Sequence, residues 1–148
     1  MARILSEQWT GKKSVPQPAS ACITLVPITV VLPAAVALND IIALHELPPG
    51  VELVDYDLIA PQLDSNATPT ATFSLGVENA AGTDLATVYE AGLEFGRTAG
   101  GSIARATAGA AAAADATTAR RIALKVTAAF ATYAGSGKTL LAVLHLKG

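Results

Sequence analysis

The chain has 148 residues, a net charge of -2, and charged residues at 15% of its positions. This length suits one domain that buries a sizeable core without cross-links, and the single cysteine, Cys22, excludes an internal disulfide. The absence of a basic stripe argues against a dedicated nucleic-acid-binding protein. Hydrophobic residues make up 51% of the chain and aromatic ones only 5%. Such a composition indicates thin, closely packed layers, or surfaces that are buried only in an assembly.

The first 21 residues are predicted to form an extended N-terminal arm, ahead of a β-sandwich domain at residues 22–148. The arm is polar, contains Pro16 and Pro18, and shows neither helical nor strand periodicity. A single buried tryptophan can dominate a contact with a neighbour. Two placements of Trp9 stay open, because its ring can anchor a neighbour or pack on its own domain. The candidate partner-binding residues are Ile4, Leu5, Trp9, Lys12 and Lys13.

An uncharged run at residues 21–38 has two interpretations. Two lysines precede it, and Ala35-Val36-Ala37 has the small-x-small form of a signal-peptidase site. Pro27 and Pro33 interrupt the run, however, and its residues are β-branched rather than leucine-rich. Buried strands are therefore expected, with Pro27 limiting residues 22–32 to an edge strand or two short strands.

Three further strands are predicted along the middle of the chain. Residues 39–47 and 51–59 are separated by Pro48-Pro49-Gly50, a turn in which proline fixes φ and glycine accepts a positive φ. Residues 70–77 alternate cleanly between apolar and small or polar side chains. Apolar residues near helical spacing then predict a short helix at residues 84–95.

An alanine-rich segment occupies residues 104–119. Alanine has the highest helix propensity, but an isolated helix of this length is marginal in water and this one has no larger apolar stripe. We therefore expect a short strand at residues 102–107, followed by a flexible loop through residues 110–115.

The C-terminal end is predicted to form a long β-hairpin. Apolar residues alternate with other residues along 121–130 and again along 139–147. Ala134-Gly135-Ser136-Gly137 lies between them as a turn. Because a hairpin is marginal by itself, the rest of the chain must supply strands against its apolar face. The fold class expected is therefore all-β, an antiparallel β-sandwich.

The sequence contains no catalytic constellation, so neither an enzyme nor a cofactor is expected. Residues 135–139 resemble the end of a phosphate-binding P-loop, but Thr132 stands where that pattern needs glycine and a strand follows instead of a helix. His45 and His145 lack the further ligands of a zinc site. A calcium site is the remaining candidate, although its spacing does not match an EF-hand loop. Its oxygen ligands would be Asp55, Asp57, Asp64 and Asn66.

Several blocks of strand and turn residues, taken together, resemble small structural proteins of tailed bacteriophage virions. The blocks are Leu47-Pro48-Pro49-Gly50-Val51, Leu63-Asp64-Ser65, residues 70–76, residues 115–118, residues 121–127 and Gly137-Lys138-Thr139. The resemblance is a pattern of strands and turns that spans residues 39–147. Proteins of this kind, including capsid cement or decoration proteins, commonly have β-sandwich or jelly-roll folds. The resemblance therefore implies a jelly-roll-like sandwich.

The resemblance also implies a function at the capsid surface of the virion. It predicts a cement protein that binds the outer capsid surface, bridges subunits of the major capsid protein and forms a homo-oligomer, a dimer or trimer, without nucleic acid or membrane. Lys12 and Lys13 would complement an acidic shell. A tail or head-tail junction protein stays open as an alternative. So does a carbohydrate-binding sandwich, although its aromatics should share one face and the three tyrosines lie on separate elements.

Overall fold

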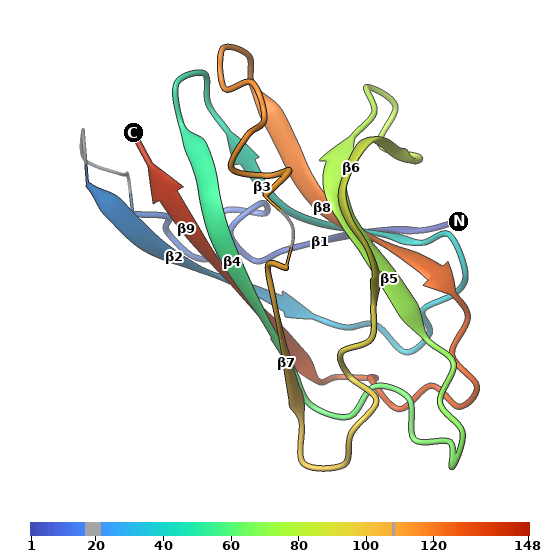
Figure 1. The fold of residues 1–148 in the computed structure, drawn as a ribbon. Helices are drawn as coiled ribbons and strands as arrows, with labels where there is room; N and C mark the ends of the chain where they lie inside the picture. The colour runs from blue at the N-terminus through green and yellow to red at the C-terminus, as the bar shows by residue number, and fades with distance from the viewer. Residues whose placement is uncertain (17–21, 108) are drawn as a thin grey trace.

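A computed structural model describes residues 1–16, 22–107 and 109–148, and these form an all-β domain (Figure 1). The end of the expected arm, residues 17–21, lies outside the described residues. Within the described part, the structure contains no helix long and apolar enough to cross a membrane. The strands are β1 (Arg3–Leu5), β2 (Ile23–Val31), β3 (Ile41–Leu47), β4 (Glu52–Ala60), β5 (Thr72–Glu78), β6 (Leu85–Leu93), β7 (Ser102–Arg105), β8 (Arg120–Ala128) and β9 (Thr139–Lys147).

The strands form two sheets that pack face to face. The five-stranded sheet has the order β1-β3-β8-β5-β6, and the four-stranded sheet has the order β2-β9-β4-β7. All neighbouring strands are antiparallel except β1 and β3. The chain crosses repeatedly from one sheet to the other, which is the connectivity of a jelly-roll-like sandwich. The predicted fold class, an antiparallel β-sandwich, is confirmed.

One hydrophobic core fills the space between the sheets. Every second residue of β2, β8 and β9 points into it, as the sequence alternation requires. Phe73 is fully buried, and its ring centroid lies 4.7 Å from that of Phe95 and 5.9 Å from that of Phe130. These rings close the end of the core beside the loops at residues 61–71 and 129–134.

The predicted C-terminal hairpin is wrong, although both of its strands exist. β8 pairs with β3 and β5, whereas β9 pairs with β2 and β4, so the two lie in different sheets. Their connection, residues 129–138, exceeds the about two to five residues of common hairpin loops and crosses the core. The apolar faces of β8 and β9 therefore face each other across the core instead of lying side by side.

The predicted helix at residues 84–95 is also wrong, because this segment forms strand β6. β6 pairs with β5 through three register irregularities. Each irregularity breaks the two-residue alternation of side chains, so the buried positions imitate helical spacing. The strand predicted in the alanine-rich region is confirmed, because β7 lies within residues 102–107. Residues 110–114 form turns and a bend instead of a helix, and the flexibility expected of this loop stays a prediction.

The close approach of β6 to β5 makes Gly76 sensitive to substitution. A Cβ atom at this position would overlap the carbonyl oxygen of Thr87, which belongs to the backbone of β6 and cannot swing away. Gly76→Ala is therefore expected to lower the free energy of unfolding by about 1–3 kcal/mol. Urea denaturation measures this change. Gly109→Ala is the control, because a Cβ atom there meets nothing within 4 Å, and an equal loss in both variants would contradict the steric explanation.

Candidate interaction surfaces

The N-terminal segment, residues 1–16, closes one edge of the sandwich. Its β1 adds a parallel strand to the five-stranded sheet, with Arg3 opposite Ile41 of β3. The chain then turns toward the other sheet, where the Glu7 amide donates to the Thr29 carbonyl oxygen at 2.9 Å. The side chain of Gln8 bonds β2 as well, at the backbone of Pro27 and Thr29. The segment predicted to be an arm thus begins as part of the fold and ties the edges of both sheets together.

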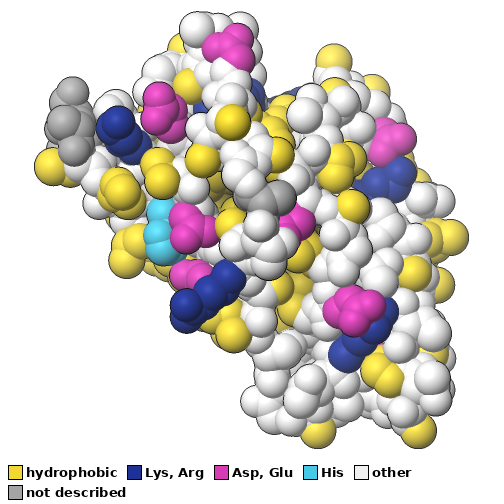
Figure 2. Space-filling model, in the orientation of Figure 1, with side chains coloured by type: hydrophobic (Ala, Val, Ile, Leu, Met, Phe, Trp, Pro, Cys, Tyr) yellow, Lys and Arg dark blue, Asp and Glu magenta, His cyan; other side chains and the backbone are white. Residues whose placement is uncertain are grey.

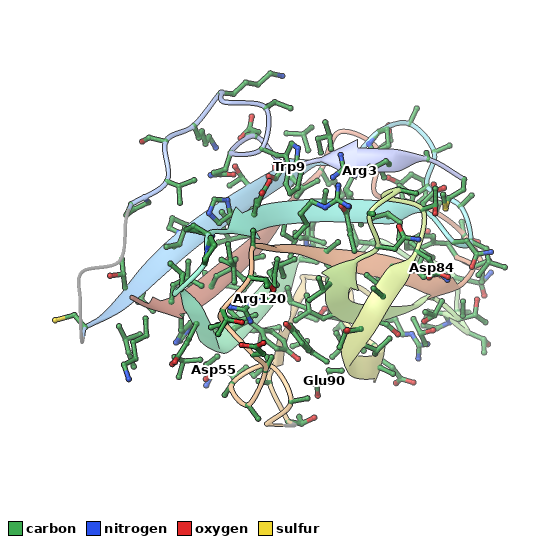
Figure 3. The ribbon with its side chains drawn as sticks, turned by 90° about the horizontal axis from the view of Figure 1, so that it is seen from above. Arg3, Trp9, Asp55, Asp84, Glu90 and Arg120 are labelled. Carbon is green, nitrogen blue, oxygen red and sulfur yellow. The ribbon has the colours of Figure 1, made fainter. Side chains whose placement is uncertain are left out.

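A buried carboxylate holds β1 in place. The Glu78 side chain is fully buried and accepts hydrogen bonds from Arg3 Nε and Nη2 at 3.0 and 2.8 Å. Arg121 Nε lies 3.5 Å from the same carboxylate. The Arg3 guanidinium also stacks over Trp9, with Cζ 4.6 Å from the ring centroid, and Figure 3 shows these two side chains next to each other. Two arginines therefore balance one buried charge, and one of them orders the indole.

The five candidate partner-binding residues differ in what they contact. Ile4 packs against the core of its own domain. Trp9 is partly exposed and lies on its own domain beneath Arg3. Leu5 and Lys12 are exposed, and Lys13 pairs with Glu7 at 2.7 Å. Of these five residues, Leu5, the two lysines and part of the Trp9 indole therefore face solvent.

A second surface is the outer face of the four-stranded sheet. Its side chains are the outward-pointing members of β2, β9, β4 and β7, and large apolar residues dominate them. They are Ile23, Leu25, Val31, Ile59 and Ile103, all exposed, with the partly buried Leu141 and Val143 between them. Figure 2 shows hydrophobic side chains around a histidine and neighbouring acidic and basic groups on this side of the molecule. Exposed apolar side chains gathered on one sheet face make it a candidate contact site.

Sequence reasoning did not identify this face, although a signal for it was present. β2 and β9 are apolar on both faces, as strands are when both faces are buried. The alternation was sufficient to predict strands, but it did not show which apolar set points outward. Which apolar side chains point outward is decided only when β2 and β9 take their places in the four-stranded sheet.

A row of charged groups crosses the same face. Asp57 of β4 lies 3.3 Å from Arg105 Nε and 3.1 Å from His145 Nε2. Arg105 is mostly exposed, whereas Asp57 and His145 are largely covered. The row therefore presents a cation at its β7 end and a carboxylate in its middle.

The four oxygen ligands of the predicted calcium site do not converge. Asp57 belongs to the charged row, and Asp55 accepts a hydrogen bond from the backbone of Tyr56. Asp64 is fully buried beyond the opposite end of β4, where backbone amides donate hydrogen bonds to its carboxylate. The described residues hold no cluster of three or more metal-ligating side chains. In the P-loop-like segment, Gly137 turns the chain with a positive φ directly into β9.

A polar cluster forms where Glu90 of β6 meets two other segments, β4 and the chain that follows β7. The Tyr56 hydroxyl and the Thr107 hydroxyl and amide donate to the Glu90 carboxylate. Burial and the hydrogen bond to Glu90 raise the pKa of Tyr56, which therefore stays protonated as the donor. Burial opposes ionisation of Glu90, but the hydroxyl and amide donors outweigh it and lower its pKa. The cluster joins β4, β6 and the end of β7, which is a structural role.

Comparison with known proteins identifies the family. No protein-family model matches the sequence, and no curated protein matches it. Among solved structures, a chain of the capsid of Ralstonia phage GP4 is 30% identical, with a TM-score of 0.79 and 99% of each chain covered. A chain of the capsid asymmetric unit of cyanophage Pam1 shares the fold at 22% identity, with a TM-score of 0.66 and coverage of 93% of this chain and 96% of that one. The chain belongs to the capsid structural proteins of bacteriophages, and its place is the virion.

Proposed function

We propose that this protein is a cement, or decoration, protein that binds the outer surface of a phage capsid and bridges subunits of the major capsid protein. The observation that carries the proposal is the match of this small sandwich to a capsid chain over 99% of both chains. The described residues leave little chain to interlock with neighbours, because even the N-terminal segment is tied to both sheets. Such a body suits attachment to a shell built by another protein.

Attachment of this kind stabilises the shell by mass action. A protein that binds the assembled lattice but not free subunits shifts the equilibrium toward assembly. Repeated contacts over a symmetric surface add through multivalency, so that a modest affinity at each site suffices. We further propose that the protein acts as a homo-oligomer, a dimer or trimer, which increases the number of contacts each particle makes.

The N-terminal segment is the proposed capsid contact. Leu5 and the indole of Trp9 offer apolar surface, and Lys12 and Lys13 offer positive charge to an acidic shell. Ile4 supports the segment from below, since it packs on the core. The segment lies at the β2 edge of the sandwich, where Glu7 and Lys13 bond the Thr29 hydroxyl, and so leaves β4 and β7 at the other edge of the four-stranded sheet free.

A charge reversal at Lys12 tests this contact. Lys12→Glu is expected to weaken shell binding about tenfold, which corresponds to about 1.4 kcal/mol of binding free energy. The reason is that the new carboxylate would face the acidic groups of the shell and be repelled by them. Co-sedimentation titrations with undecorated shells measure the dissociation constant. Val88→Glu is the control, since it also adds negative charge at an exposed position but lies on β6, outside both the segment and the four-stranded sheet. Equal weakening in both variants would point to general charge attraction and contradict a specific contact.

The decisive experiment for the proposed function is saturation of purified shells followed by a count of bound copies. Saturable binding at a copy number that matches the lattice symmetry is expected of cement. A copy number that matches one small ring would replace the proposal with a tail or head-tail junction role. Failure to bind any shell would reject attachment to the capsid surface.

A further inference from the structure

The described protein leaves most of the outer face of the four-stranded sheet uncovered; the N-terminal segment reaches it only at Thr29 of β2, whose hydroxyl bonds Lys13 and Glu7. Ile23 and Leu25 are 58% and 57% exposed, and Ile103 is 50% exposed. A hollow of about 440 Å³ lies at the corner of the face, between Ile59 and Pro61 on one side and Gly101 and Ile103 on the other. Large apolar side chains gathered on one sheet face indicate a surface that is buried in an assembly.

Strand register arranges this face in rows at different heights along the strands. One row is apolar and contains Leu141, Ile59 and Ile103, which are neighbours across β9, β4 and β7. The next row contains Val143, Asp57 and Arg105 in the same strand order. The apolar row and the row with the charges therefore lie at different positions along the strands. Within the second row, the opposite charges of Asp57 and Arg105 lie side by side on neighbouring strands.

This arrangement is complementary to itself. A two-fold axis that lies in the contact plane, parallel to the strands and between β4 and β7, keeps each row at its own height and exchanges β4 with β7. Ile103 then lies over the partner's Ile59, and Arg105 lies over the partner's Asp57. A two-fold contact is reciprocal: if residue i of one copy contacts residue j of the partner, residue j also contacts the partner's residue i. The pairs Ile103–Ile59 and Arg105–Asp57 meet this condition. The salt bridge within one copy becomes part of a four-membered charge network across two.

We propose that β4 and β7 of the four-stranded sheet pack on the same two strands of a second copy of this chain, as a two-fold dimer. β9 and β2, with Ile23 and Leu25, lie beyond this overlap. This dimer rests on the homo-oligomer proposed above and assigns the surface through which its copies contact each other. Ile59 and Ile103 of both copies supply the apolar contact, and Asp57 with Arg105 fix the register. Ile103 fills the hollow of the opposite copy. The N-terminal segments lie outside the contact and stay available to the capsid.

The test is the mass of the purified protein in solution, measured by size-exclusion chromatography with light scattering. A reductant is present, because Cys22 is exposed and would otherwise cross-link copies. The wild type is expected at twice the 15.0 kDa chain mass. Ile103→Glu is expected to be monomeric, because it buries a charge against Ile59. Val88→Glu is the matched control and is expected to stay dimeric, since Val88 is also 50% exposed on a strand but belongs to β6.

A charge swap tests the register of the pairing. Arg105→Asp is expected to weaken the dimer at least tenfold, because carboxylates then oppose each other. The double variant Asp57→Arg with Arg105→Asp restores opposite charges in both copies and is expected to recover most of that loss. Failure of the double variant to recover, while circular dichroism shows it folded, would overturn the proposed two-fold register.

Two results would overturn the dimer outright, and both are independent of the cement role. A monomeric wild type, or a dimer that Ile103→Glu leaves intact, would exclude this face as the contact between copies. If the wild type is monomeric and Ile103→Glu abolishes shell binding, the capsid protein covers the face instead. If the dimer forms as expected but binds no shell, the inference stands and the proposed capsid function fails.

Discussion

Asp64→Ala is expected to lower the free energy of unfolding by about 3–5 kcal/mol, a large part of the total stability of a domain this size. The carboxylate is fully buried and accepts backbone N–H groups from two loops. In one loop the donors are Asn66, Thr70 and Ala71, and in the other Ala131 and Thr132, at 2.9 to 3.3 Å. Removal of the side chain leaves these donors without partners in a covered site.

Urea denaturation of wild type and variant measures the loss. Asp115→Ala is the control, because Asp115 is exposed and bonds only the neighbouring Thr117, so its removal is expected to cost under about 1 kcal/mol. Asp64→Asn keeps the shape of the side chain and is expected to lose less than Asp64→Ala. A cost at Asp64 no larger than at Asp115 would contradict the role assigned to the buried carboxylate.

The same group predicts a pH dependence. Burial opposes ionisation of Asp64, but backbone hydrogen bonds from Thr132, Ala131, Thr70 and Ala71 outweigh burial and lower the pKa from 3.8 to about 2. A folded-state pKa below the unfolded value stabilises the fold at pH above 3.8, and this contribution of about 2 kcal/mol is lost as the pH falls through 2. The difference in stability between wild type and Asp64→Asn should therefore shrink below pH 3.8. A difference that stays constant down to pH 2 would contradict the lowered pKa.

Deletion of residues 1–13 is expected to destabilise the sandwich by roughly 4 kcal/mol, as well as to weaken capsid binding. The deletion removes β1 from the edge of β3, the bonds to β2 at Thr29, and Ile4 from the core. It also removes Arg3 and leaves the buried Glu78 with Arg121 as its remaining partner. Thermal and urea denaturation measure the loss.

Point substitutions separate the structural role of this segment from its binding role. Trp9→Ala and Lys12→Glu leave β1 and the Arg3–Glu78 pair in place, so they are expected to cost under about 1.5 kcal/mol. A truncated protein as stable as the wild type would show that the segment is a free arm after all. Loss of capsid binding in the truncated protein would be evidence for a contact only if its fold is shown to be intact.

Strand positions followed from the sequence because alternation is a local property. The predicted strands at residues 39–47, 51–59 and 70–77 coincide with β3, β4 and β5 to within a few residues. Alternation failed at β6, where register irregularities with β5 break the period of two. It also missed β1, whose three residues are too few to show any period.

The candidate sites depended far more on the tertiary structure. The amphipathic pattern of β8 and β9 is the same whether the strands pair with each other or face each other across a core, so the hairpin prediction failed. For the same reason the sequence did not reveal the outer face of the four-stranded sheet, which is built from β2, β9, β4 and β7. Asp57, Arg105 and His145 meet there although they are far apart in the chain.

The sequence by itself determined the all-β class, the main strands and a resemblance to phage virion proteins. These features rest on local alternation, turn residues and composition, which are present in short stretches of chain. Only the tertiary structure decided which strands share a sheet, that residues 3–5 belong to the fold, and which apolar side chains face outward. Those properties depend on long-range pairing, and residues that pair across a sheet carry no local mark of their partner.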